Sequence, residues 1–130
     1  MEQECLKEAE DLTKGLVYYT SNDCDKDILA IVRENLLSIG LPIVAVSLKP
    51  IDFENNIVLD LEKGPLTMYR QQLAGLEKIN TDIVFFVEHD VIYPKCHFDF
   101  VPPRNDTFYY NINWWKVRTN DGKTCHSSVE

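Results

Sequence analysis

The feature that most constrains the fold is a run of five apolar residues, Ile83 to Val87, that leads directly into Glu88-His89-Asp90. An unbroken run of β-branched and aromatic residues is typical of a strand buried on both faces, as in a parallel sheet covered by helices. Alternate residues of a strand point the same way, so Glu88 and Asp90 are predicted to share one side and His89 the other. Two carboxylates at the carboxyl end of such a strand suit Mg²⁺ or Mn²⁺ held against a phosphate.

Strands and helices alternate before this segment. Apolar runs predict strands at 16–22, 42–48 and 81–87, with a short edge strand at 57–59. Helices are predicted at 25–39 and 65–79, the first capped by Asp23 or Asp25 and ended by Gly40, the second with Pro65 in its first turn. This order predicts βαβ units with parallel strands and right-handed crossovers.

Each predicted helix carries an apolar stripe at helical spacing, which is interpreted as its core-facing side. In the first helix the stripe consists of Ile28, Ile31, Val32, Leu36 and Ile39, and in the second of Leu66, Tyr69, Leu73 and Leu76.

The pattern changes after Asp90. Residues 97–103 are interpreted as a loop with one short strand, and residues 108–117 as an aromatic-rich strand. A tight turn at 120–123 predicts a terminal hairpin. Adjacent strand residues face opposite sides, so one of Trp114 and Trp115 is expected in the core, while Phe108, Tyr109 and Tyr110 are interpreted as packing residues. No closing element follows, which predicts that the domain is cut short at its C-terminal side.

Length and charge limit the function classes. A chain of 130 residues is expected to form one domain, and its net charge of −8 argues against a nucleic-acid surface. An acidic segment over residues 1–14 is predicted to be an exposed helical leader. No run approaches the roughly 18 apolar residues of a membrane span. The four scattered cysteines are interpreted as reduced thiols of a cytoplasmic protein.

The order of these elements resembles the nucleotide-binding half of GT-A glycosyltransferases, closest to the large family-two-like group. A strand ending in Tyr19-Thr20-Ser21-Asn22, a helix, the strand Val44–Leu48, a second helix and a strand ending in Glu88-His89-Asp90 carry this resemblance over residues 15–115. It implies a three-layer α/β/α sandwich with a mostly parallel sheet. It also implies that residues 15–130 are a donor-binding domain whose acceptor part lies elsewhere.

The resemblance further implies which residues bind the donor. Glu88-His89-Asp90 matches the family's DXD motif with Glu in the first position, so Glu88 and Asp90 would hold Mn²⁺ or Mg²⁺ against the diphosphate of a sugar nucleotide, a UDP-sugar being favoured. Where many relatives carry an aspartate for the base, this chain has Ser47. The positions that would meet the base, the ribose or the rest of the donor are Tyr19, Thr20, Asn22, Ser47 and Arg70.

The sequence assigns neither the catalytic base nor the acceptor, for which a sugar, a lipid and a protein all stay open. Asp99, Asp106 and Asp121 are the carboxylates downstream of the metal motif, where the family's base usually lies. The exposed aromatic segment and a strand edge also suggest a homo-oligomer.

Other interpretations stay open beside this one. Glu88 and Asp90 are also compatible with a solvated strand end, and His89 with a structural role. Cys96-His97 and Cys125-His126 supply four potential zinc ligands, although their spacing is not that of known zinc modules. The alternative functions are a non-catalytic α/β module that binds a partner through its aromatic C-terminal segment, and a nucleotidyltransferase. The latter lacks its usual Gly-rich basic loop after the first strand.

Overall fold

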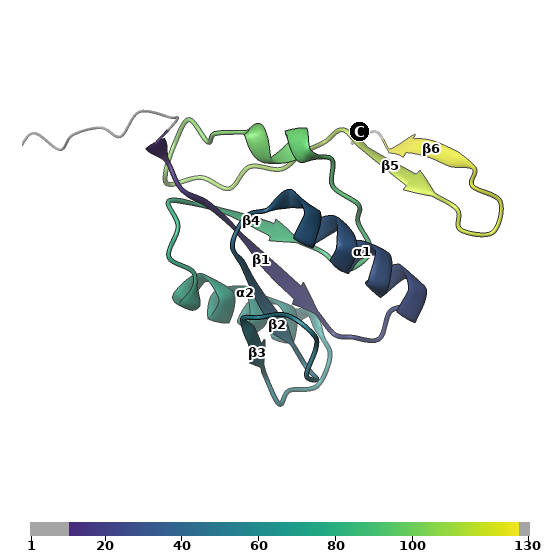
Figure 1. Ribbon diagram of the computed structural model, residues 1–130, viewed down its shortest axis with the longest axis horizontal. Helices are drawn as coiled ribbons and strands as arrows, with labels where there is room; N and C mark the ends of the chain where they lie inside the picture. The colour runs from purple at the N-terminus through teal and green to yellow at the C-terminus, as the bar shows by residue number, and fades with distance from the viewer. Residues whose placement is uncertain (1–10, 128–130) are drawn as a thin grey trace, which may run out of the picture.

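The computed structural model describes residues 11–127, and Figure 1 shows its ribbon. Four parallel strands form the main sheet in the order β3-β2-β1-β4, which confirms the predicted parallel α/β arrangement. The strands are β1 (Lys14–Thr20), β2 (Ile43–Ser47), β3 (Asn56–Val58) and β4 (Ile83–Val87). Most of the leader predicted over residues 1–14 lies outside the described residues, and Lys14 already belongs to β1.

Helix α1 (Lys26–Ile39) begins and ends where its local signals predict. The Asp25 carboxylate accepts hydrogen bonds from the backbone amides of Asp27 and Ile28, at 2.9 and 3.3 Å, and Gly40 ends the helix with a φ of 80°. The helix buries Val32 and Leu36 against one face of the sheet. Ile31 was predicted to belong to that stripe but is 56% exposed, so it is not a core residue.

Helix α2 (Pro65–Lys78) covers the opposite face. Its contact with the sheet runs through Gly75, where an added Cβ would lie 2.3 Å from Val17 Cγ1. Leu16 and Tyr18 belong to the core cluster with α1, and Val17 lies between them in the strand. Since neighbouring strand residues face opposite sides, the two helices sandwich the sheet.

The core stripe predicted for α2 is wrong. Its members are between 39% and 64% exposed, and they are Leu66, Tyr69, Leu73 and Leu76. The helix instead buries Gln71, whose Nε2 donates to the backbone oxygens of Thr20 at 2.8 Å and Val46 at 3.1 Å. Helix α2 therefore packs on the sheet through the face that carries Gly75 and Gln71. Gly75 permits close approach to β1, and the Gln71 amide bonds to two strands.

After β4 the chain crosses the α1 side of the sheet. The Asn35 side chain on α1 donates to the backbone oxygen of Tyr93 at 2.9 Å and accepts from its amide at 2.8 Å. A 3₁₀ helix, η2 (Lys95–Asp99), replaces the short strand predicted in this region and buries Phe98 in the core. These contacts fix the segment that follows Glu88-His89-Asp90.

A separate antiparallel hairpin, β5 (Trp114–Val117) and β6 (Thr124–Ser127), confirms the predicted turn and projects away from the main sheet (Figure 1). The strand predicted over 108–117 is only partly right, because residues 108–113 are not in a strand. Trp114 and Trp115 are 43% and 59% exposed, so neither is a core residue. Phe108, Tyr109 and Tyr110 are exposed as well, because this segment lies outside the helix-covered sheet.

Within residues 11–127, no helix is long and apolar enough to cross a membrane. Cys24, Cys96 and Cys125 are free thiols.

Candidate functional site

The strand order creates a switch point at the carboxyl ends of β1 and β4. From β1 the chain passes through α1 to β2 and β3 on one side, and then returns through α2 to β4 on the other side of β1. The loops that follow the neighbouring strands β1 and β4 therefore run in different directions. In open α/β sheets this is where ligands bind.

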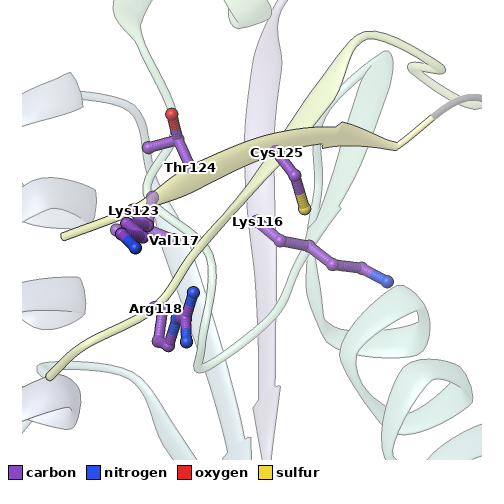
Figure 2. A pocket seen from close by; sticks show the side chains of 6 residues that line it. All are labelled: Lys116, Val117, Arg118, Lys123, Thr124 and Cys125. Carbon is purple, nitrogen blue, oxygen red and sulfur yellow. The ribbon is translucent and has the colours of Figure 1, made fainter. Parts of the chain in front are cut away.

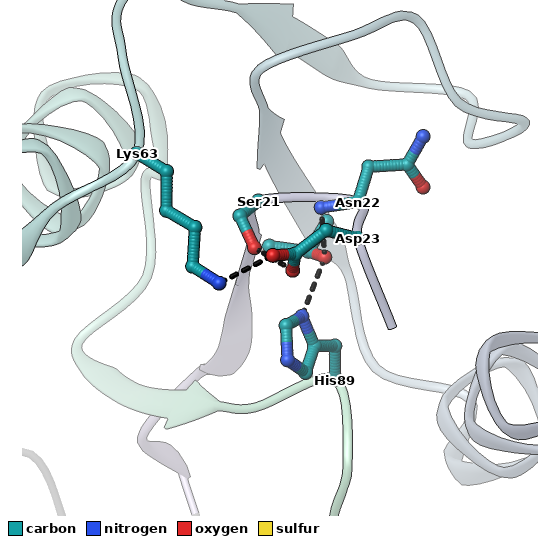
Figure 3. Close-up of polar contacts among 6 residues, drawn as sticks. Ser21, Asn22, Asp23, Lys63 and His89 are labelled. Atoms are coloured by element: carbon teal, nitrogen blue, oxygen red, sulfur yellow. Dashed lines mark hydrogen bonds and ion pairs between the residues drawn. The ribbon is translucent and has the colours of Figure 1, made fainter. Parts of the chain in front are cut away.

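A side-chain contact joins the two strand ends at this point. Thr20 Oγ1 lies 2.7 Å from His89 Nδ1 and accepts a hydrogen bond from the Asn22 amide at 2.9 Å (Figure 3). Thr20 is only 2% exposed, whereas Asn22 is half-buried and has a φ of 61°. Asparagine tolerates this left-handed conformation better than most residues. Thr20 is thus a buried support of the site, and Asn22 lies at its surface.

An ion pair extends this cluster of Thr20, Asn22 and His89 toward α2. Lys63, just before that helix, donates from Nζ to one oxygen of Asp23, and Ser21 Oγ donates to the other (Figure 3). The bonds from Lys63 and Ser21 lower the pKa of Asp23 to about 2, so this carboxyl group is ionised at neutral pH. The pair connects the loop after β1 with the start of α2.

The backbone at Glu88-His89-Asp90 differs from the prediction. Strand β4 ends at Val87, and His89 and Asp90 form a turn, so the predicted strand alternation does not apply to them. Burial raises the pKa of Tyr93 to about 12, and the negative charges of Glu88 and Asp90 both contribute to the increase.

Hydrogen bonds orient Glu88 in particular. Tyr19 Oη donates to Glu88 Oε1 at 3.0 Å, and the Glu88 amide donates to Tyr93 Oη at 3.1 Å. Burial, followed by the charge of Glu88, raises the pKa of Tyr19, so its phenol stays protonated and remains a donor at neutral pH. Tyr19 thus contacts Glu88 directly.

Glu88 and Asp90 are the residues of this segment that could hold a hard divalent cation. Both side chains belong to exposed residues, and Mg²⁺ or Mn²⁺ needs only one or two protein carboxylates when phosphates and water complete its shell. No group of three or more His, Cys, Asp or Glu side chains capable of holding a metal occurs between residues 11 and 127. The two Cys-His pairs are therefore not gathered into one set of four ligands in this part of the chain. Their histidines contact Asn111 and Asn113 instead.

Two other predicted donor-site residues take no part in the side-chain contacts described above, although Ser47 is paired with Thr20 in the register of β1 and β2. Ser47 is fully buried, and its Oγ donates to the Lys49 carbonyl at 2.5 Å and accepts from Asn56 Nδ2 at 3.0 Å. Its hydroxyl is thus committed to holding the β2–β3 connection. Arg70 is exposed on α2, and none of the polar contacts described above for the cluster involves it.

An open hollow of about 280 Å³ adjoins the cluster on the α1 side. Tyr18 lines it from β1, Asn22 from the loop that follows, and residues 50–53 from the loop after β2. The Tyr18 and Phe53 rings are 5.2 Å apart, and the Arg33 guanidinium lies 5.6 Å from the Phe53 ring centre. Arg33 also forms a 3.0 Å ion pair with Asp52. The hollow therefore combines aromatic surface with a hydrogen-bonding donor and acceptor.

The sequence interpretation missed Lys63 and the hollow. A signal for Lys63 was present, since a cation directly before a helix that follows a parallel strand lies at the carboxyl edge of the sheet. No comparable signal existed for Arg33 and Phe53, which are brought together by packing.

No protein-family model, curated protein or solved structure matches this chain.

Proposed function

We propose that this chain is a metal-dependent glycosyltransferase, or the donor-binding domain of one, which uses a nucleoside-diphosphate sugar. The observation that carries the proposal is the contact between His89 and Thr20, which places the acidic Glu88–Asp90 turn beside the loop after β1 at the switch point. The resemblance of the element order to GT-A glycosyltransferases supports the same assignment.

The nucleoside would occupy the hollow beside α1. A planar base suits a space lined by the rings of Tyr18 and Phe53, and Arg33 and Asp52 offer polar contacts to its edge. Asn22 belongs both to this lining and to the loop that meets the acidic turn. The donor would therefore extend from the hollow toward Glu88 and Asp90.

The acidic turn would hold the divalent ion against the diphosphate. Such an ion stabilises the charge that develops on the leaving phosphates. The role of the chain is then to orient Glu88 through the Tyr19 hydroxyl. Of the downstream carboxylates, Asp106 is paired with Arg104, which lowers its pKa and makes it a weak base, and Asp121 is paired with Arg118.

The test is calorimetric binding of UDP, GDP, CDP and dTDP with Mn²⁺, Mg²⁺ or EDTA. We expect one diphosphate to bind in the presence of metal and to lose most of its affinity in EDTA and in Asp90→Asn. Asp60→Asn is the matched control, since it removes an exposed carboxylate that is outside the acidic turn. Equal binding by Asp90→Asn and wild type, or no binding of any diphosphate, would contradict the proposal.

A non-catalytic partner-binding module is the second candidate, and the terminal hairpin favours it. Trp114 and Trp115 are exposed, and a shallow hollow of about 210 Å³ on the hairpin is lined in part by Lys116, Arg118 and Lys123 (Figure 2). A function of this kind would be insensitive to Asp90→Asn. The same binding panel therefore separates the two candidates.

A further inference from the structure

The ion pair between Lys63 and Asp23 lies at the place where the proposed donor would present its phosphates. Lys63 extends from the start of α2 toward the loop after β1, and His89 lies against the same loop (Figure 3). The Lys63 and Asp23 side chains are 68% and 47% exposed, so solvent and ligands reach both.

An exposed ion pair of this kind is readily exchanged. Water solvates each partner well, and surface pairs contribute little to stability. A diphosphate carries more negative charge than a carboxylate and offers more acceptor oxygens, which makes it a stronger partner for an ammonium group. Asp23 is ionised at neutral pH, so its carboxylate attracts the Lys63 ammonium group and opposes a phosphate at the same place.

We propose that Lys63 binds the diphosphate of the donor, and that Asp23 is an internal competitor that holds the Lys63 ammonium group while the site is empty. This inference rests on the proposed function and names a further residue of the same site. When donor binds, Lys63 Nζ leaves Asp23 and donates to a phosphate oxygen. Ser21 Oγ keeps its hydrogen bond to Asp23 and so takes over part of the stabilisation of that carboxylate.

Competition predicts that the two partners have opposite effects on affinity. Lys63→Met removes a charged contact and should weaken binding of the nucleoside diphosphate about tenfold. Asp23→Asn removes the competitor and should tighten binding only about threefold, because surface pairs of this kind are weak. If the pair served only to connect two loops, both substitutions would weaken binding.

The experiment is calorimetry on the full chain with Mn²⁺ and the diphosphate that wild type binds tightest, with the matching nucleoside as a second ligand. Lys49→Met and Asp60→Asn are the matched controls, since each removes one exposed charge of the same sign elsewhere. Lys63→Arg keeps the charge and should retain most of the affinity. Nucleoside binding should be unchanged in Lys63→Met and in Asp23→Asn.

The outcomes separate this inference from the function on which it rests. If wild type binds no diphosphate, the proposed function is overturned and this inference with it. If wild type binds a diphosphate but Asp23→Asn binds it more weakly, or Lys63→Met binds it equally well, the competition is overturned while the donor site stands. Thermal midpoints of all variants show whether each one is folded at the temperature of the measurement.

Discussion

Replacing Gly75 by alanine tests the packing that places α2 on the sheet. A Cβ at this position would lie 2.3 Å from Val17 Cγ1 and 3.1 Å from Cγ2. Val17 is fully buried, and a β-branched side chain has few alternative rotamers, so it cannot simply turn away. Either α2 must lift from β1 or Val17 must adopt a strained conformation.

Two opposing terms decide the size of the effect. Overpacking a core of this kind costs roughly 2–3 kcal/mol. Alanine favours the helix over glycine by about 1 kcal/mol. We therefore expect Gly75→Ala to lower the free energy of unfolding by about 1–2 kcal/mol, which for a chain of this length lowers the thermal midpoint by roughly 4–8 °C.

Urea denaturation of Gly75→Ala, Val17→Ala and the double variant measures this directly. Val17→Ala alone should cost about 2–3 kcal/mol, because it removes two buried methyl groups and leaves a cavity. In the double variant the methyl group introduced at position 75 occupies part of that cavity, so the loss should be smaller than the sum by about 1–2 kcal/mol. Gly64→Ala is the control, since its added Cβ meets nothing within 4 Å.

Leu73→Ala tests the exposed apolar stripe of α2, whereas Gly75→Ala tests the face of the helix that contacts the sheet. Leu73 is 55% exposed, so its truncation should cost less than about 1 kcal/mol. A core position would lose about 2–5 kcal/mol. If Gly75→Ala stabilises the protein while Leu73→Ala destabilises it by that larger amount, α2 packs through its apolar stripe and the reasoning is refuted.

Two further predictions concern the segment after the acidic turn. Asn35→Ala leaves the amide and carbonyl of Tyr93 without their side-chain partner. It should lower the free energy of unfolding, measured by urea denaturation, by about 1–3 kcal/mol. A loss below about 0.5 kcal/mol would contradict this reasoning. Burial raises the pKa of Tyr93 from 10.0 to about 12, so its contribution to stability is complete below pH 10 and is lost as pH rises through 12. Tyr93→Phe should therefore reduce the alkaline loss of stability between pH 10 and 12, and equal pH profiles for the two proteins would contradict this.

Sequence reasoning succeeded where the physical cause is local. The Asp25 cap, the left-handed Gly40 and the position of Pro65 depend on backbone geometry within a few residues. The strand at 83–87 and the tight turn at 120–123 are local in the same sense, although only Ile83 and Val87 of this edge strand are buried. The candidate site was found in part for this reason, because polar residues directly after buried strands can be read along the chain.

Tertiary structure decided which surfaces meet. The apolar stripe of α2 predicted one packing face, but Gln71 found carbonyl partners on two strands and Gly75 allowed close approach to Val17, so the helix turned its polar and glycine positions inward. The order of the strands in the sheet could not be predicted from the sequence pattern either. The return of β4 to the side of β1 opposite β2 is what brings His89 to Thr20 and creates the switch point. Sequence determined the elements and their ends, because those depend on neighbours in the chain, whereas the site depends on partners that only packing selects.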